Sequence, residues 1–155
     1  MSPLAAESDN LAFARYHVAD VSSGEDAAAG TMDWVGATVR KIRALGSLPP
    51  GWDSYGASSI PVEARDRAIG LVVRVATLEG VPAPHVGATP DGEVVLWWRE
   101  GIKGLEVFAG EHEPIEFVVT NEAHPERSRE GNSTRVDQIV WHVHDFFCDS
   151  QRADA

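Results

Sequence analysis

The residues of this chain best suited to chemistry lie between Leu48 and Pro61, in the stretch LPPGWDSYGASSIP. A carboxylate, Asp53, follows Trp52 directly and precedes the phenol of Tyr55, among glycines and prolines. Such a group of side chains can hold a cation or a ligand, or act as a general acid or base. The same residues suit a structural corner, because an aspartate accepts hydrogen bonds from backbone N–H groups of its own turn. We favour the structural interpretation and keep binding of a ligand or partner as the alternative.

Histidines near the C-terminus suggest a different chemistry, a metal site. In the stretch WHVHDFF, His142 and His144 are separated by one residue, and on a helix such side chains point roughly 200° apart. They cannot bind one ion from a single helix face, and His144 with Cys148 is the better-spaced pair. The acid–histidine group at 111–113, EHE, falls in a predicted hairpin turn and suits a solvated tip. We predict no metal site and no cofactor.

Glutamates of the predicted strands are the remaining candidates for acid–base chemistry. Glu100, Glu106 and Glu116 face one another on a sheet only if the strand register brings them together. Lys103 and Gly104 lack the glycine spacing of a phosphate-binding loop. The sequence also lacks the GxSxG, HExxH, CxxC and GxGxxG motifs. We therefore predict no catalytic residue.

Composition favours one acidic globular domain. The chain has 155 residues, of which 43% are hydrophobic, and its formal net charge is -11. This charge disfavours nucleic acids and anionic membranes, whose recognition needs clustered Lys and Arg. It favours a basic protein partner, although an acidic balance is also a common means of staying soluble.

Cysteine usage and the N-terminal sequence favour a cytoplasmic protein. The single cysteine, Cys148, excludes an intramolecular disulfide and suits a reducing compartment. The N-terminal residues MSPLAAESDNLAFARYHVADV lack the basic start and the continuous apolar run of a signal peptide. No window has the roughly eighteen apolar residues of a membrane span.

The chain divides into a tail and a domain. Residues 1–30 are rich in alanine, serine, glycine and acidic side chains and predict a weakly ordered acidic tail, followed by a single α+β domain over 31–150. The exception within the tail is LAFARYHV, Leu11 to Val18. Its large apolar side chains can dock a short element on the body of the domain or on a partner.

Two helices are predicted in the N-terminal half of the domain. Apolar side chains recur at helical spacing from about Met32 to Leu45, and Gly46 lies where a left-handed cap is expected before two prolines. A second helix begins near Pro61, a residue suited to a first helical turn, and ends by Gly80.

From His85 onwards the apolar period changes to two, which predicts an antiparallel meander. Trp97 and Trp98 are adjacent and must point to opposite sheet faces, so that one packs under the helices and the other covers the opposite face. The predicted strands are 85–89, 93–99, 105–109 and 115–120.

The last predicted elements are a polar loop over Asn121–Ser133 and a third helix from Thr134 to about Asp149. The helix carries a broad apolar stripe, which indicates that it packs on the core. The predicted fold class is therefore α+β: two N-terminal helices, a four-stranded antiparallel meander, and a C-terminal helix packed on the same sheet face as the others.

The pattern of motifs resembles a family of small bacterial proteins of uncharacterised function. Those proteins share a Leu-Pro-x-x-Trp-Asp-x-Tyr-Gly-Ala core, which stands here as LPPGWDSYGA. They also share a later Pro-Thr-Pro-Asp-Gly-Gly turn before a strand, from which this sequence departs slightly with ATPDGE at residues 88–93. The resemblance covers roughly residues 35–120. It implies a paired-protein role, since such genes often neighbour a second small gene in mobile or defence-related regions. The resemblance implies no activity.

The expected function is a non-catalytic, acidic protein-interaction module. We expect it to be the neutralising or accessory member of a bacterial two-gene system, with a basic protein partner encoded nearby. Exposed aromatic residues dominate binding hot spots, which makes the corner and the tryptophan pair the candidate binding residues. These are Trp52, Asp53, Tyr55, Trp97 and Trp98.

Two other functions are kept as alternatives. One is a small hydrolase or ligand-binding enzyme centred on Asp53 and Tyr55, which requires His85, His142 or His144 within hydrogen-bond reach of Asp53. The other is an element of a larger assembly that docks through its N-terminal tail.

Overall fold

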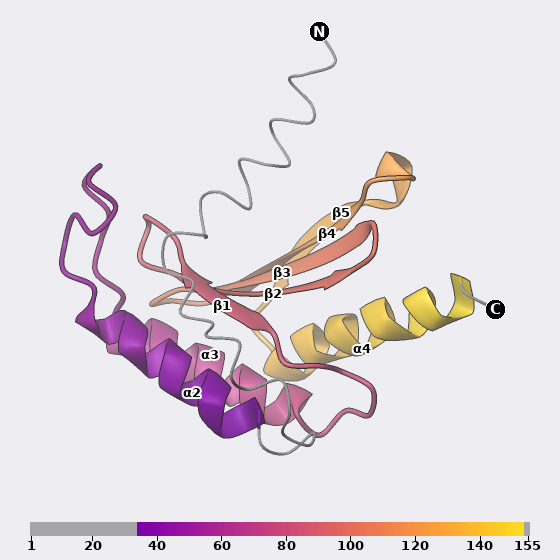
Figure 1. The fold of residues 1–155 in the computed structure, drawn as a ribbon, viewed down its shortest axis with the longest axis horizontal. Coiled ribbons are helices and arrows are strands. Elements are labelled where there is room, and N and C mark those ends of the chain that lie inside the picture. The colour runs from indigo at the N-terminus through magenta and orange to yellow at the C-terminus, as the bar shows by residue number, and fades with distance from the viewer. Residues whose placement is uncertain (1–33, 154–155) are drawn as a thin grey trace, which may run out of the picture.

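The structure is a computed structural model, and it describes residues 34–153. The predicted tail over residues 1–30, with its stretch from Leu11 to Val18, lies outside the described residues. Within them, three α-helices lie on one side of a single antiparallel sheet, as Figure 1 shows. The predicted α+β class is confirmed.

Helices α2 (Trp34–Ala44) and α3 (Val62–Val75) confirm the two N-terminal helices. Both bury one apolar stripe, and Pro61 precedes the first turn of α3 as its N-cap residue. The cap expected at Gly46 is wrong, because α2 continues into a 3-10 turn, η3 (Leu45–Ser47), that includes this glycine. A Cβ on Gly46 would lie 2.5 Å from the guanidinium of Arg65, so the glycine leaves room for the Arg65 side chain on α3.

The sheet has five strands, so the predicted count of four is wrong. They pair as a meander in the order β1-β2-β3-β4-β5. Their bounds are β1 His85–Ala88, β2 Val94–Glu100, β3 Lys103–Ala109, β4 Ile115–Asn121 and β5 Arg129–Ser133. The additional strand, β5, and a 3-10 turn, η4 (Pro125–Arg127), lie within the predicted polar loop over Asn121–Ser133.

The inner face of the sheet carries the main core, under α2, α3 and the C-terminal helix α4 (Val136–Ala153). Trp98 is buried on this face, where its ring meets Phe147 of α4 edge-on and its indole N–H donates to the carbonyl of Pro82 at 2.9 Å. The C-terminal helix therefore packs on the same face as the other helices, as predicted. None of the helices in residues 34–153 is long and apolar enough to cross a membrane.

The opposite side of the sheet, called the outer face below, carries alternate strand residues. Its centre is a small apolar cluster of Val95, Trp97 and Phe108, with Val118 packed against it. Trp97 and Trp98 thus point to opposite faces, as the two-residue period predicts. None of the described helices packs on the outer face (Figure 1).

Candidate functional site on the outer sheet face

The predicted corner is a closed loop whose polar groups satisfy one another. The Asp53 carboxylate accepts hydrogen bonds from the backbone N–H groups of Tyr55 at 2.8 Å and Ala57 at 3.0 Å. The indole of Trp52 donates to the carbonyl of Ser58 at 2.9 Å. Asp53 and Trp52 are therefore occupied in holding the loop, while the Tyr55 side chain is 93% exposed and available for contact.

The histidines lie apart from this loop. His85 stacks on Trp97 with ring centroids 5.3 Å apart, and His142 stacks on Phe117 at 4.0 Å. His144 lies 3.5 Å from the Cys148 sulfur. In the part of the chain that the structure describes, no hydrogen bond joins a histidine to Asp53, and no group of three or more metal-ligating side chains could hold an ion.

A glutamate lies at the centre of the outer face. The strand register places Glu106 of β3 between Trp97 of β2 and Val118 of β4. It is only 6% exposed, and its Oε1 atom has no hydrogen-bond partner within residues 34–153. Burial among apolar neighbours disfavours the charged carboxylate and raises the pKa of Glu106 to about 7.

Further carboxylates surround Val118. Glu106 and Glu130 are its cross-strand partners on either side, and Glu116 is on the same face, two residues before it on β4. Diagonal neighbours on a sheet face are about 7–8 Å apart, within reach of long side chains. Of the three strand glutamates singled out in the sequence, the structure thus brings Glu106 and Glu116 together and leaves Glu100 on the other face, opposite Lys103.

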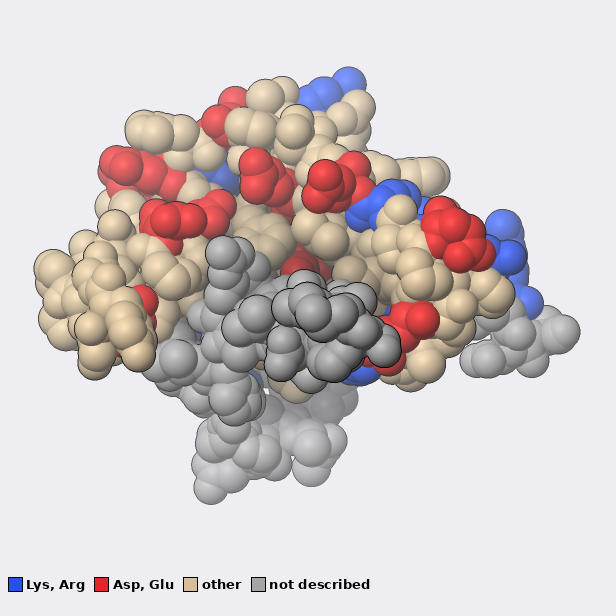
Figure 2. Space-filling view, turned by 90° about the horizontal axis from the view of Figure 1, so that it is seen from above, with Lys and Arg blue, Asp and Glu red and all other residues tan. Residues whose placement is uncertain are grey.

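A further glutamate, Glu93, directly precedes β2 and extends this acidic region. Burial raises the pKa of Glu93, and a hydrogen bond from Thr89 lowers it. The negative charges of Glu116 and Asp91 raise the pKa further. Figure 2, which views the molecule from the side opposite the helices, shows acidic side chains gathered on this surface.

The outer face is hollowed between its last two strands. A depression of about 350 Å³ is lined by side chains and backbone of β4 and β5, and it is more polar than apolar. Exposed carboxylates of Glu116 and Glu130 flank half-buried Val118 in this lining, with Asn132 beside them. The depression therefore offers negative charge around a small apolar floor.

No ion pair among the described residues neutralises the acidic region. The Lys and Arg ion pairs within residues 34–153 are formed by Arg67, Arg99, Lys103, Arg129 and Arg135, and none of these pairs includes Glu93, Glu106, Glu116 or Glu130. Arg99, on the outer face at the end of β2, pairs with Glu122. The acidic surface is thus left without a neutralising Lys or Arg from residues 34–153.

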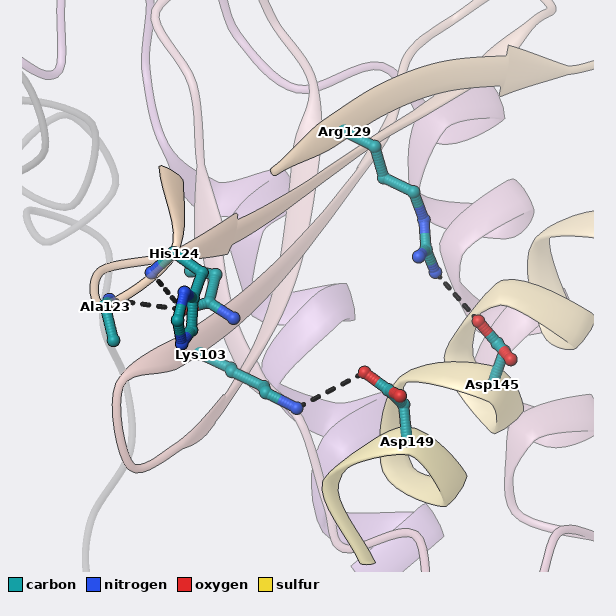
Figure 3. Close-up of polar contacts among 7 residues, drawn as sticks. Lys103, Ala123, His124, Arg129, Asp145 and Asp149 are labelled. Atoms are coloured by element: carbon teal, nitrogen blue, oxygen red, sulfur yellow. Dashed lines mark hydrogen bonds and ion pairs between the residues drawn. The ribbon is translucent and has the colours of Figure 1, made fainter. Parts of the chain in front are cut away.

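A second depression, of about 270 Å³, lies between α4 and the strands and is lined by charges of both signs. Lys103 approaches Asp149 at 3.3 Å and Arg129 approaches Asp145 at 2.9 Å, as Figure 3 shows. Both pairs connect a strand to α4. Because Lys103 and Arg129 already have carboxylate partners on α4, we interpret these pairs as contacts that hold α4 on the sheet.

The outer-face site escapes prediction because it depends on register. Trp97 was a candidate from the sequence, whereas Glu106, Glu116 and Glu130 meet only through the pairing of β3, β4 and β5. The available signal was the alternation of glutamate with apolar residues in GLEVFA and IEFVV, which places an acid on the side away from the core.

Comparisons with known proteins find no significant relative of this chain. No protein-family model matches the chain, and searches of curated proteins and of solved structures find no significant match.

Proposed function

We propose that this protein is an acidic, non-catalytic interaction module that binds a basic segment of a partner protein through the depression between β4 and β5. We further propose that it is the neutralising or accessory member of a bacterial two-gene system, and that the partner is encoded nearby. The second statement rests on the family resemblance of the LPPGWDSYGA stretch.

One observation carries the proposal: the carboxylates around Val118 are crowded together without a neutralising cation from the described residues. Like charges on neighbouring strand positions destabilise a sheet. This repulsion lowers the stability of the isolated domain, and a Lys or Arg from a partner would relieve the repulsion. The cation would lie between Glu116 and Glu130, with its aliphatic stem on Val118.

The net charge of -11 supports the same partner chemistry at longer range. An acidic surface attracts a basic partner before contact and speeds association, an effect that salt weakens. Tyr55, exposed at the tip of its loop, is a second candidate contact, whereas Trp98 lies under the helices and offers no surface.

The test uses charge-neutral substitutions in the depression. Glu116→Gln with Glu130→Gln should weaken binding of a lysine-rich peptide, or of the product of the adjacent gene, by about tenfold or more in isothermal titration calorimetry. The matched control is Glu63→Gln with Glu79→Gln, which removes the same charge from exposed positions on and after α3. The control should leave affinity within about twofold. If both double variants weakened binding equally, the effect would come from net charge alone and the proposal would be wrong.

A further inference from the structure

We infer that the second depression, between α4 and the strands, is a binding site for the carboxylate group of a small organic acid. Arg127 holds the carboxylate, and the apolar side chains of Val119 and Phe146 in the lining receive its carbon stem. This inference does not rest on the proposed function, which concerns the other depression, between β4 and β5.

The strand register gathers the lining of this depression. Val119 of β4 lies opposite Arg129 of β5, and Asn121, two residues further along β4, lies opposite Lys103 of β3. A spacing of two residues keeps side chains on one sheet face, and Val119 belongs to the inner face. Two cations from different strands are therefore brought to the side of the sheet that α4 covers.

The first argument is an excess of positive charge. The charged residues of the lining are three cations, Lys103, Arg127 and Arg129, and two acids, Asp145 and Asp149. One positive charge is thus left over, in a chain whose formal net charge is -11. Such a local excess favours an anion, and its size matches the single charge of one carboxylate.

Arg127 is the cation that supplies this excess. Lys103 and Arg129 reach towards neighbouring turns of α4, where Asp149 and Asp145 hold them (Figure 3). Arg127 lies in η4 with an exposed side chain, and within residues 34–153 this side chain forms no ion pair or hydrogen bond. A guanidinium presents its N–H donors in a planar fork that matches the two oxygens of a carboxylate.

The second argument is a surplus of hydrogen-bond donors. Lys103 and Arg129 each donate one side-chain hydrogen bond to α4, which leaves further N–H groups on both. Asn121 adds a donor, because its Oδ1 atom already accepts from the backbone N–H groups of Ala123 and His124 and only its NH2 group remains. A ligand that offers acceptors and no donors, as a carboxylate does, suits this lining.

The third argument is size. The depression has a volume of about 270 Å³, just below the roughly 300–1,000 Å³ of sites for drug-sized ligands. Val119 and Phe146 belong to the main core and give the lining an apolar part. A small acid fits both features, with its short stem on these side chains and its carboxylate at Arg127.

The experiment titrates full-length, nitrogen-15-labelled protein with sodium propionate at constant ionic strength. The amide signals of Thr120, Arg127 and Arg129 should shift and saturate with a Kd on the order of 10 mM, while that of Val73, exposed on α3, should stay in place. Propionamide has a similar shape without the charge and should not shift these signals. Equal shifts with propionamide, or no saturable shift with propionate, would overturn the inference.

Two variants test the role of Arg127. Arg127→Gln should weaken propionate binding about tenfold or more, because it removes both the charge and the fork of donors. The matched control is Arg43→Gln, which removes the same charge from an exposed position on α2 and should leave the Kd within about twofold. An unchanged Kd in Arg127→Gln, or an equal loss in both variants, would contradict the assignment.

Inorganic phosphate is the last probe, because a phosphate group also suits a guanidinium. Propionate should bind more tightly than phosphate, since phosphate has no carbon stem to place on the apolar side chains of the lining. Tighter binding of phosphate would assign the depression to phosphate groups and overturn the inference.

Discussion

Glu106 lies directly opposite Trp97 in the β2–β3 register, so the indole and the carboxyl are cross-strand neighbours on the outer face. This pairing holds an ionisable group in an apolar setting. A carboxylic acid there prefers its neutral form, and the pKa of Glu106 is accordingly about 7 against an ordinary 4.5. The relationship has a measurable consequence for stability.

Glu106→Gln should stabilise the protein at about pH 8 by about 1–2 kcal/mol and have little effect at about pH 5. Because the folded-state pKa of Glu106 is raised, folding takes up a proton between the two pKa values, 4.5 and about 7. The contribution of this group is therefore present at low pH and lost as the pH rises towards 7. Urea unfolding at several pH values measures the difference. Glu79→Gln, at an exposed position, is the control and should leave the pH dependence unchanged.

His142 gives a pH dependence of the opposite sign. Burial lowers the pKa of His142 below 6.5, and the positive charge of Arg129 lowers it further. The negative charge of Asp145 acts in the opposite direction. Since the unfolded chain then binds the proton more readily, stability falls as the pH drops through 6.5 and below. His142→Phe keeps an aromatic ring on Phe117 and should remove part of this acid-induced loss in thermal unfolding at about pH 5. An unchanged loss would show that other groups cause it.

Asp53→Ala should destabilise the fold by about 1–2 kcal/mol, because it leaves two backbone N–H groups of the corner without their acceptor. Tyr55→Ala, two residues away and on an exposed side chain, should change stability by less than about 0.5 kcal/mol. Urea denaturation of both variants compares them directly. If Asp53→Ala were as neutral as its control, the corner would not depend on this carboxylate.

Gly131→Ala should destabilise by about 1–3 kcal/mol, since a Cβ at this position would lie 2.9 Å from the Phe117 ring. Gly70→Ala is the matched control, because Gly70 lies in the middle of α3 with nothing within 4 Å of the added atom. Alanine favours a helix over glycine, so the control should stabilise by about 0.5–1 kcal/mol. Thermal or chemical unfolding of the pair should therefore show opposite signs.

Much of the fold follows from local signals in the sequence. Apolar spacing defined α2, α3 and α4 to within a few residues, and Pro61 marked the start of α3. The alternation of VVLWWRE correctly separated Trp97 from Trp98. These features depend on neighbours in the chain, which is why periodicity is sufficient to find them.

The fifth strand could not be predicted in this way. Its sequence, REGNS, has no apolar alternation and includes a glycine, so it resembles a loop. It is a strand because its backbone pairs with β4 and because Phe117 and α4 cover its inner side. The acidic cluster around Val118 escaped prediction for the same reason, since β5 contributes Glu130 to it.

The contact between Phe117 and Gly131 has a consequence for strand alignment. Phe117 lies opposite Gly131 in the register, with its ring in the space that a side chain there would occupy and with His142 stacked on the ring. A shift of β5 by one residue would bring Glu130 or Asn132 under this ring, where a side chain has no room. The phenyl ring thus fixes the register of β5, whose own sequence has no apolar alternation that would fix it. By fixing the alignment on the inner face, it also determines which glutamate stands beside Val118 on the outer one.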